Sequence, residues 1–258
     1  MTTFTVSNIE DSGAGSFRDA IIGANQSSGL DEIIFDIPGS EPHTIQALSP
    51  LPDITDSVII DGTTQSGYAG TLIIKLNGEN TGDNVDGLTI TADGSGSIIQ
   101  GLAIHSFSGD GIILDGSDSN QISGNYIGTD STGIIDLGNQ GNGISLINGA
   151  DNNLIGGTSG ANLSSNASDA LSLGSEGNLI LGNDGDGIEL SGSGTNLNQI
   201  TNNYIGTDVT GTQVIANEDG VSVNDGSSEN IINHNLISGN LDDGVPIADP
   251  ETIDSICL

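Results

Sequence analysis

Residues 120–133 read NQISGNYIGTDSTG, and residues 198–211 read NQITNNYIGTDVTG. The two segments are identical at eleven of fourteen positions and begin 78 residues apart. Self-similarity of this kind is typical of repeat architectures, in which one structural unit stacks on the next. The sequence therefore predicts a solenoid built from similar coils.

Two shorter units recur around these segments. In both, aliphatic residues follow a residue that accepts a tight turn, which indicates short strands with a period of two. One unit has the pattern Gly-aliphatic-X-aliphatic and begins at Gly87, Gly101, Gly111, Gly143, Gly187, Gly220 and Gly244. The other unit has the pattern Asn-X-Ile and begins at Asn120, Asn153, Asn178, Asn198 and Asn230.

Strands this short cannot build the core of an ordinary sandwich, but coils stacked about 4.8 Å apart align many of them in parallel. Gly and Asn suit the corners between such strands because both accept a positive φ. Stacked Asn side chains can also hydrogen-bond from coil to coil. The predicted fold is therefore all-β, a parallel β-helix. The alternative is an antiparallel β-sandwich, which would show longer alternating strands joined by two-residue hairpins.

The first fifty residues differ in texture from the rest. Ser16 and Asp19 resemble a capping box, and they are followed by a pattern that predicts one short amphipathic helix after an initial strand at 4–6. The apolar residues at helical spacing are Phe17, Ala20, Ile21 and Ala24. Because a solenoid must cover the open end of its first coil, we expect this helix to act as a cap.

The chain is expected to divide into three continuous parts. Residues 1–50 form the N-terminal cap, residues 51–247 form the coils, and residues 248–258 form an irregular tail, which suggests truncation or the start of a missing module. Residues 157–177 lack the coil pattern over about half their length, and they predict a loop of the kind that often carries binding function in solenoids.

Charge excludes several classes of partner. The chain has 35 acidic side chains against two basic ones, Arg18 and Lys75, and a formal net charge of -33. This field repels nucleic acid and anionic lipid. No apolar stretch approaches the ~18 residues of a membrane span, so we expect no membrane insertion. The single Cys257 cannot form an internal disulfide.

Location is inferred from the same composition. No N-terminal signal peptide is visible, because the first residues lack both a basic and an apolar region. Extreme acidity fits a secreted or salt-exposed protein, in which cations screen the self-repulsion. We therefore expect an extracellular or cell-surface protein whose export signal lies elsewhere.

Several segments together resemble a known family. Residues 11–21 read DSGAGSFRDAI, residues 51–54 read LPDI, and residues 60–68 read IDGTTQSGY. With the two NYIGTDXTG repeats, they resemble bacterial right-handed parallel β-helix proteins of the pectin-lyase-like superfamily. More narrowly, they look like secreted or surface proteins with an N-terminal Gly-Ser-Leu-Arg-X-Ala-Ile motif, although Phe17 stands here at the Leu position. The resemblance implies the right-handed fold over nearly the whole chain, and it implies little about function because the superfamily holds enzymes and adhesins alike.

The resemblance raises the possibility of an enzyme acting on polysaccharides. A lyase of this superfamily uses an Arg or Lys base beside calcium held by Asp; only Arg18 and Lys75 could serve, and neither shares an obvious cleft with an Asp cluster. A glycoside hydrolase needs two carboxylates, which 35 acidic residues leave open. The Gly-His-Gly segment of the polygalacturonases is absent, and Asp242-Asp243, which resembles their paired aspartates, falls in the last coil.

The three histidines are separated in the sequence. His43, His105 and His234 do not form a motif together. We interpret His105 and His234 as residues on the surface of the coils rather than as catalytic groups.

Calcium is the more credible ligand. Asp184 and Asp186, and likewise Asp115 and Asp118, place carboxylates on Gly-rich turns, as a hard cation prefers. Neither pair completes an EF-hand loop, so solvated turn carboxylates are the competing interpretation. No other cofactor is expected.

The Asp of each long repeat, Asp130 and Asp208, has a simpler explanation. A carboxylate in a turn accepts hydrogen bonds from nearby main-chain amides. We therefore expect both to stabilise corners.

Taken together, the residues predict a non-catalytic extracellular or cell-surface module. It would serve as a structural or adhesion scaffold that contacts polysaccharide or cell-surface glycans, with cations, possible calcium among them, screening its charge. The alternative is a carbohydrate-active enzyme that uses paired Asp residues in a lateral groove. An enzyme would show convergent carboxylates with perturbed pKa values, whereas a scaffold would show dispersed ones.

Overall fold

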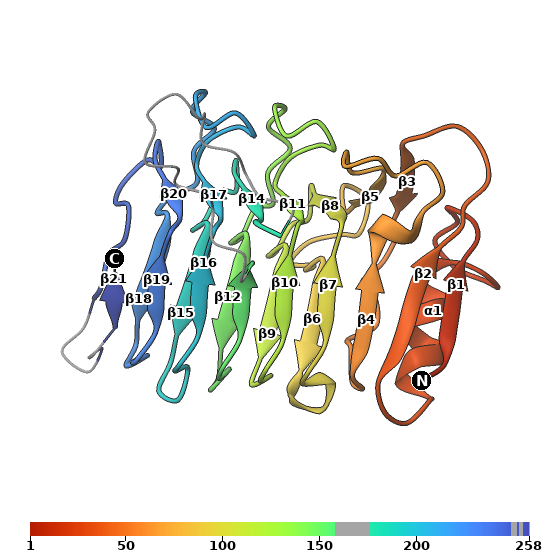
Figure 1. The fold of residues 1–258 in the computed structure, drawn as a ribbon, viewed down its shortest axis with the longest axis horizontal. Coiled ribbons are helices and arrows are strands. Elements are labelled where there is room, and N and C mark those ends of the chain that lie inside the picture. Colours follow the sequence, from red (N-terminus) through yellow and green to blue (C-terminus); the bar gives the residue numbers. More distant parts are fainter. Residues whose placement is uncertain (158–175, 249–251, 253–254, 258) are drawn as a thin grey trace.

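The computed structural model describes residues 1–157, 176–248, 252 and 255–257. It is a parallel β-helix, with three sheets running along the long axis of the molecule (Figure 1). Over most of the length of the molecule, each coil contributes one short strand to each sheet. Neighbouring strands of a sheet therefore come from successive turns of the chain. The predicted fold class is confirmed, and the sandwich alternative is wrong.

Sheet A has nine strands within the described residues and runs from one end of the molecule to the other. Its strands, in spatial order, are β1 (Thr3–Val6), β2 (Asp31–Phe35), β4 (Val58–Asp61), β7 (Ile98–Gln100), β10 (Gln121–Ser123), β13 (Leu154–Gly156), β16 (Gln199–Thr201), β19 (Ile231–Asn233) and β21 (Ile256–Cys257). The last strand lies in the tail that the sequence predicted to be irregular.

Sheets B and C complete the three sides. Sheet B contains β3 (His43–Gln46), β5 (Ile74–Asn77), β8 (Leu102–His105), β11 (Tyr126–Ile127), β14 (Leu179–Ile180), β17 (Tyr204–Ile205) and β20 (Leu236–Ile237). Sheet C contains β6 (Leu88–Thr91), β9 (Ile112–Asp115), β12 (Ile144–Ile147), β15 (Ile188–Ser191) and β18 (Val221–Asn224). Two 3-10 turns, η1 (Gly62–Thr64) and η2 (Ala92–Gly94), lie at corners.

The core is made of aliphatic side chains stacked in register. One column of isoleucines in sheet A is almost fully buried and consists of Ile33, Ile60, Ile99, Ile122, Ile155, Ile200 and Ile232. Burial of each such side chain contributes roughly 1.5–3 kcal/mol. The repeated aliphatic residue of the Asn-X-Ile and Gly units is therefore the residue that holds successive coils together.

The predicted cap is confirmed. Helix α1 (Phe17–Asn25) packs against β1 and β2, and it buries Phe17, Ala20, Ile21 and Ala24, the four residues at helical spacing. The Ser16 hydroxyl accepts the amide of Asp19 at 3.1 Å, as an N-cap should. Figure 1 shows the helix at the N-terminal end of the stack.

Most predicted strands form, with two adjustments. The unit at Gly101 and the unit at Asn178 both belong to sheet B, in β8 and β14. The unit at Gly244 makes only an isolated bridge, between Ile247 and Val223. The predicted loop at 157–177 falls mostly on residues 158–175, which lie outside the described residues.

Candidate functional site

Asparagines, most of them buried, form a ladder at each of the three corners. In the first ladder, the side chain of each Asn accepts the amide of its equivalent in the preceding coil; for example, the Asn153 amide donates to Asn198 Oδ1 at 2.9 Å. The members are Asn120, Asn153, Asn198 and Asn230 in the first ladder, Asn125, Asn178, Asn203 and Asn235 in the second, and Asn139, Asn183, Asn217 and Asn240 in the third. The side-chain amides of these asparagines satisfy the hydrogen-bonding groups of the buried main chain. Their role is therefore to hold the fold together.

Each long repeat forms one strand of sheet A and one strand of sheet B, followed by a loop that folds over sheet B. The first loop is closed by an antiparallel bridge between Thr129 and Asp136, and the second by one between Thr207 and Val214. The loops touch, since the Val209 amide donates to the Gly133 carbonyl at 3.0 Å. A second apolar cluster lies beneath them and contains Leu179, Leu181 and Tyr204, with Tyr126, Val209, Ile215 and Leu236 packed against it.

The Asp of each repeat holds its loop. Asp208 accepts the amides of Thr212 and Gln213, both at 3.0 Å, and the Thr210 hydroxyl. Burial acts to raise the pKa of Asp208, but these hydrogen bonds outweigh it, so the pKa is lowered. Asp130 accepts the amide and the hydroxyl of Thr132. The local hydrogen bonds agree with the expected structural role.

The four predicted calcium ligands do not converge. Asp186 precedes strand β15 at the entry edge of sheet C, whereas Asp115 ends strand β9 at the exit edge. Asp184 is exposed and lies near Asp186 at the entry edge. Asp118 lies near Asp115 at the exit edge, where it accepts the Asp151 amide at 2.8 Å. Among the described residues, no three His, Cys, Asp or Glu side chains are grouped so that they could hold a metal ion.

A column of polar side chains runs along the entry edge of sheet C. In this column one carboxyl or amide oxygen accepts the main-chain amide of the equivalent residue in the next coil, as in Asp186 and Asp219 at 3.2 Å. This column, which we call the acidic column, consists of Asp86, Asp110, Asn142, Asp186, Asp219 and Asp243. The sequence pattern singled out only Asp186 and Asp243, because neighbouring members are 24 or more positions apart and share only the Gly that follows them.

Two carboxyl groups of this column have raised pKa values. For Asp86, burial is the main cause, and the negative charges of Asp110 and Asp53 add to it. For Asp186, burial is again first, followed by the charges of Asp219, Glu189 and Glu218. Asp110 and Asn142 separate the two in the column, so the perturbed groups do not form a pair.

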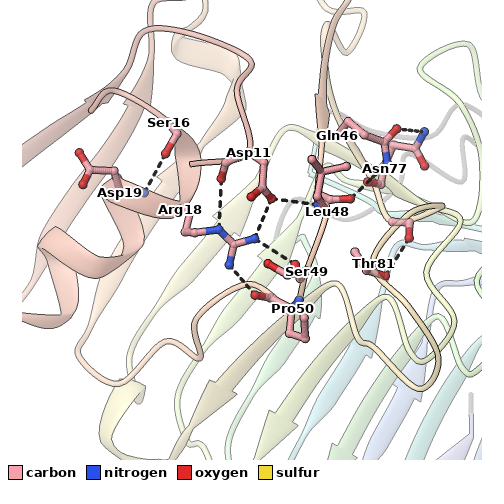
Figure 2. A network of polar contacts seen from close by, with 12 residues as sticks. Asp11, Ser16, Arg18, Asp19, Gln46, Leu48, Ser49, Pro50, Asn77 and Thr81 are labelled. Atoms are coloured by element: carbon pink, nitrogen blue, oxygen red, sulfur yellow. Dashed lines mark hydrogen bonds and ion pairs between the residues drawn. The ribbon is translucent and has the colours of Figure 1, made fainter. Parts of the chain in front are cut away.

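The two basic side chains are not together either. The Arg18 guanidinium binds Asp11 at 2.8 Å and donates to the carbonyl groups of Ser49 and Pro50 (Figure 2). It therefore ties the cap to the chain that enters the coils. Lys75 lies in β5 on the outer face of sheet B, where it forms no ion pair within the described part of the chain.

The histidines occupy three different environments. His234 is exposed in a turn, as expected. His105 points outward from sheet B but is only 5% exposed, so the expectation of a surface residue is wrong. The chain after the first repeat returns over it, where the Ser106 amide bonds Leu137. Burial first, and then the charge of Lys75, lower the pKa of His105 to about 4. His43 is buried near Gln65 at 3.4 Å.

A cleft beside sheet A is the most promising binding feature. It has a volume of about 210 Å³ and lies where sheet A gives way to sheet B. Gln100 and Gln121 from adjacent strands, Ser123, Thr63 and Tyr68 line it, together with Gly101, Gly124 and Glu176. Gln121 Nε2 donates to the Ser123 hydroxyl at 3.2 Å, which fixes the amide. Amides, hydroxyls and a phenol are groups that hydrogen-bond to sugar hydroxyls.

Glycine makes room for this cleft. Gly101 has a φ of +76°, and a Cβ atom there would lie 2.7 Å from the Thr63 side chain and 2.9 Å from its main-chain nitrogen. Sequence analysis missed Gln100 and Gln121, since it treated the Asn-X-Ile units only as strands. The sequence signal for Gln121 was its place at the X position of the Asn-X-Ile unit that begins at Asn120. In a strand, the residue before an inward isoleucine points outward.

Two further cavities lie elsewhere. One of about 310 Å³ is lined by Glu79, Asp83, Ser106 and Gln140, among others, and one of about 300 Å³ near the cap is lined by Glu10, Ile37 and His43, among others. None of these three cavities is lined by Asp86, Asp186 or the other members of the acidic column. The described cavities and the perturbed carboxyl groups are thus in different places.

No family model matches the sequence, and no curated protein matches it. Among solved structures, an alginate lyase from Paenibacillus sp. str. FPU-7 is similar, with a TM-score of 0.48 and 18% identity over 91% of this chain and 75% of that one. The Dettilon tailspike protein (gp208) aligns with a TM-score of 0.24 and 16% identity, over 89% and 54% of the two chains. Neither likeness is close enough to bear on activity.

In the described part of the chain, no helix has the length and apolar character needed to cross a bilayer.

Proposed function

We propose that this chain is a non-catalytic extracellular or cell-surface β-helix module, a rigid scaffold that contacts glycans. The observation that carries the proposal is the way its polar side chains are used. The asparagine ladders and the acidic column bind the amides of neighbouring coils, and the carboxyl groups with raised pKa are separated and lie outside the described cavities.

The scaffold role follows from the stacking. In the part of the described stack that holds the asparagines, successive coils are joined by three sheets and three ladders, so bending the rod there would break several hydrogen bonds at once. Such a rod keeps a surface feature at a fixed position over its length. The cleft lined by Gln100 and Gln121 is the feature that supports glycan contact.

The charge of -33 supports location in a salt-rich exterior. In such a medium cations screen the repulsion between exposed carboxylates that lie more than about 10 Å apart at 0.1 M salt. Calcium would then act mainly by screening, and Asp115, Asp118, Asp184 and Asp186 would bind it separately rather than as one site.

One observation favours an enzyme as the second candidate. Adjacent positions of the acidic column are about one strand spacing apart, ~4.8 Å, which is near the ~5–5.5 Å between the carboxyl groups of retaining glycosidases. Asp186 and Asp219 occupy two such positions, and the Asp186 pKa is raised. Against this, each carboxylate already accepts a main-chain amide.

The test is an assay for turnover on a panel of neutral and acidic polysaccharides, with and without calcium. We expect no reducing ends above those of a heat-denatured sample. Reducing ends that disappear in Asp186→Asn but persist in the matched Asp115→Asn variant would overturn the proposal in favour of the hydrolase. Calcium and magnesium, compared at equal ionic strength, should raise the midpoint of thermal unfolding equally; a rise specific to calcium would show a true site.

A further inference from the structure

The outer face of sheet A is uncharged over five consecutive strands, β7 to β19. Because side chains alternate along a strand, the residues flanking each buried isoleucine point outward. These outward residues are Ile98, Gln100, Gln121, Ser123, Leu154, Gly156, Gln199, Thr201, Ile231 and Asn233. Gln199 and Ile231 are exposed, and most of the others are half-buried. These ten residues include no carboxylate, which is notable in a chain of net charge -33, although one carboxylate, Glu176, lines the adjoining cleft.

Sheet C shows the contrast. Its outer face carries Asp115 and Glu189, and the acidic column borders its entry edge. The same coils thus build one charged face and one uncharged face. An ionic partner would be attracted or repelled mainly at the charged outer face of sheet C. A ligand bound on the outer face of sheet A must be recognised by hydrogen bonds and apolar contact.

The uncharged face has the groups for such recognition. Its amides and hydroxyls, with those of the adjoining cleft, can donate to and accept from sugar hydroxyls. Ile98, Leu154 and Ile231 alternate with Gln121 and Gln199 in one column along the axis, and they provide apolar surface for the C–H face of a sugar ring. Tyr68 adds a half-exposed aromatic ring at the cleft.

The size and direction of the face indicate a polymer. The cleft, at about 210 Å³, is smaller than the ~300–1,000 Å³ of most small-molecule sites, so it fits one ring of a longer chain. The outward columns continue from it along the axis and repeat similar groups about every 4.8 Å. An extended chain lying along the rod would meet an amide or hydroxyl at successive coils.

We propose that the outer face of sheet A, from the cleft at Gln100 and Gln121 to β19, binds an uncharged polysaccharide lying along the axis. The inference rests on the proposed glycan-contacting function and narrows its ligand class. It excludes acidic polysaccharides as the preferred ligand, because the net charge of the molecule opposes their approach and the face offers no cation to offset it.

The test measures binding of a soluble neutral β-glucan, a galactomannan, polygalacturonate and alginate by affinity electrophoresis and calorimetry. The wild-type chain should bind at least one neutral polymer and neither acidic one. The double variant Gln100→Ala/Gln121→Ala should weaken binding by roughly tenfold or more, since two hydrogen-bonding side chains are lost. Gln199→Glu should weaken binding, because an uncharged polymer on this face would strip water from the new carboxylate. The matched Gln213→Glu, on an exposed loop over sheet B, should not.

Three results would overturn the inference. They are preference for an acidic polymer, absence of binding to every neutral polymer, and binding that the sheet A variants leave unchanged. Sedimentation of the chain alone tests whether a second copy of the chain occupies the face instead. Self-association that Gln199→Glu abolishes would assign the face to that second copy. None of these results produces reducing ends, so they are distinguishable from failure of the non-catalytic scaffold, which the turnover assay decides.

Discussion

The two long repeats have nearly the same sequence but different surroundings. Tyr204 of the second repeat is 3% exposed, whereas Tyr126 of the first is half-buried. The Asp208 carboxylate is likewise buried and accepts hydrogen bonds from three residues, whereas the Asp130 carboxylate, among the described residues, accepts them from Thr132 alone. The copies differ because each loop packs on whatever its neighbouring coils provide.

This comparison separates two levels of control. The inward residues, Ile127 and Ile205, are both fully buried, and both loops close through the same bridge position. Local sequence therefore sets the path of the chain. Exposure and hydrogen bonding of the outward residues depend on the stack, which the motif does not encode.

The largest expected effect comes from the residue that joins the two copies. Asn178 Oδ1 accepts the Asn125 amide, and its own amide and Nδ2 donate to Asn203 Oδ1 at 3.1 and 2.9 Å. Asn178→Ala would leave buried groups of both repeats unsatisfied, at about 1–3 kcal/mol each. We expect the free energy of unfolding to fall by about 3 kcal/mol or more, measured by chemical denaturation. Gln213→Ala, at an exposed site, is the control; a loss below about 1 kcal/mol would contradict the ladder argument.

The next effect distinguishes the two aspartates. Asp208→Ala should destabilise the chain by about 1–3 kcal/mol, and Asp130→Ala by less, because fewer and more exposed partners are lost. Equal losses would mean that the motif alone sets the contribution of its Asp.

The pH dependence of the Asp208 effect has a definite sign. Its folded pKa is lowered below the usual value, so the carboxylate stabilises the folded state fully above the unfolded pKa of about 3.9. That contribution is lost as the pH falls through the folded pKa. The difference in unfolding free energy between wild type and Asp208→Asn should therefore shrink below about pH 4. A difference that grows on acidification would contradict the lowered pKa.

Sequence reasoning recovers what depends on local pattern. The repeat at 120–133, the Gly and Asn units and the helical spacing of Phe17, Ala20, Ile21 and Ala24 each predict an element that the structure contains. The buried isoleucine column follows for the same reason, since a period of two fixes which side chain points inward.

What depends on register between coils is missed. The acidic column joins Asp186 to Asp219, and the cleft joins Gln100 to Gln121, across coils whose lengths vary. Burial of His105 depends likewise on a loop that returns from Leu137. No spacing rule within one coil gives these contacts. The two predicted calcium pairs, each made of residues close in the sequence, lie at opposite edges of sheet C.

The smallest expected effect has the opposite sign from the others. The Tyr204 hydroxyl is buried and has no hydrogen-bond partner among the residues that the structure describes, and burial raises the pKa of this side chain. Tyr204→Phe removes a polar group that gives up its water on folding, so it should stabilise the chain by about 0.5–1 kcal/mol. Tyr126→Phe should change stability little, because that side chain stays partly exposed to water. Matched denaturation curves of the two variants check this, and destabilisation by Tyr204→Phe would show that its hydroxyl is satisfied in solution and that the two repeats are more alike than their burial indicates.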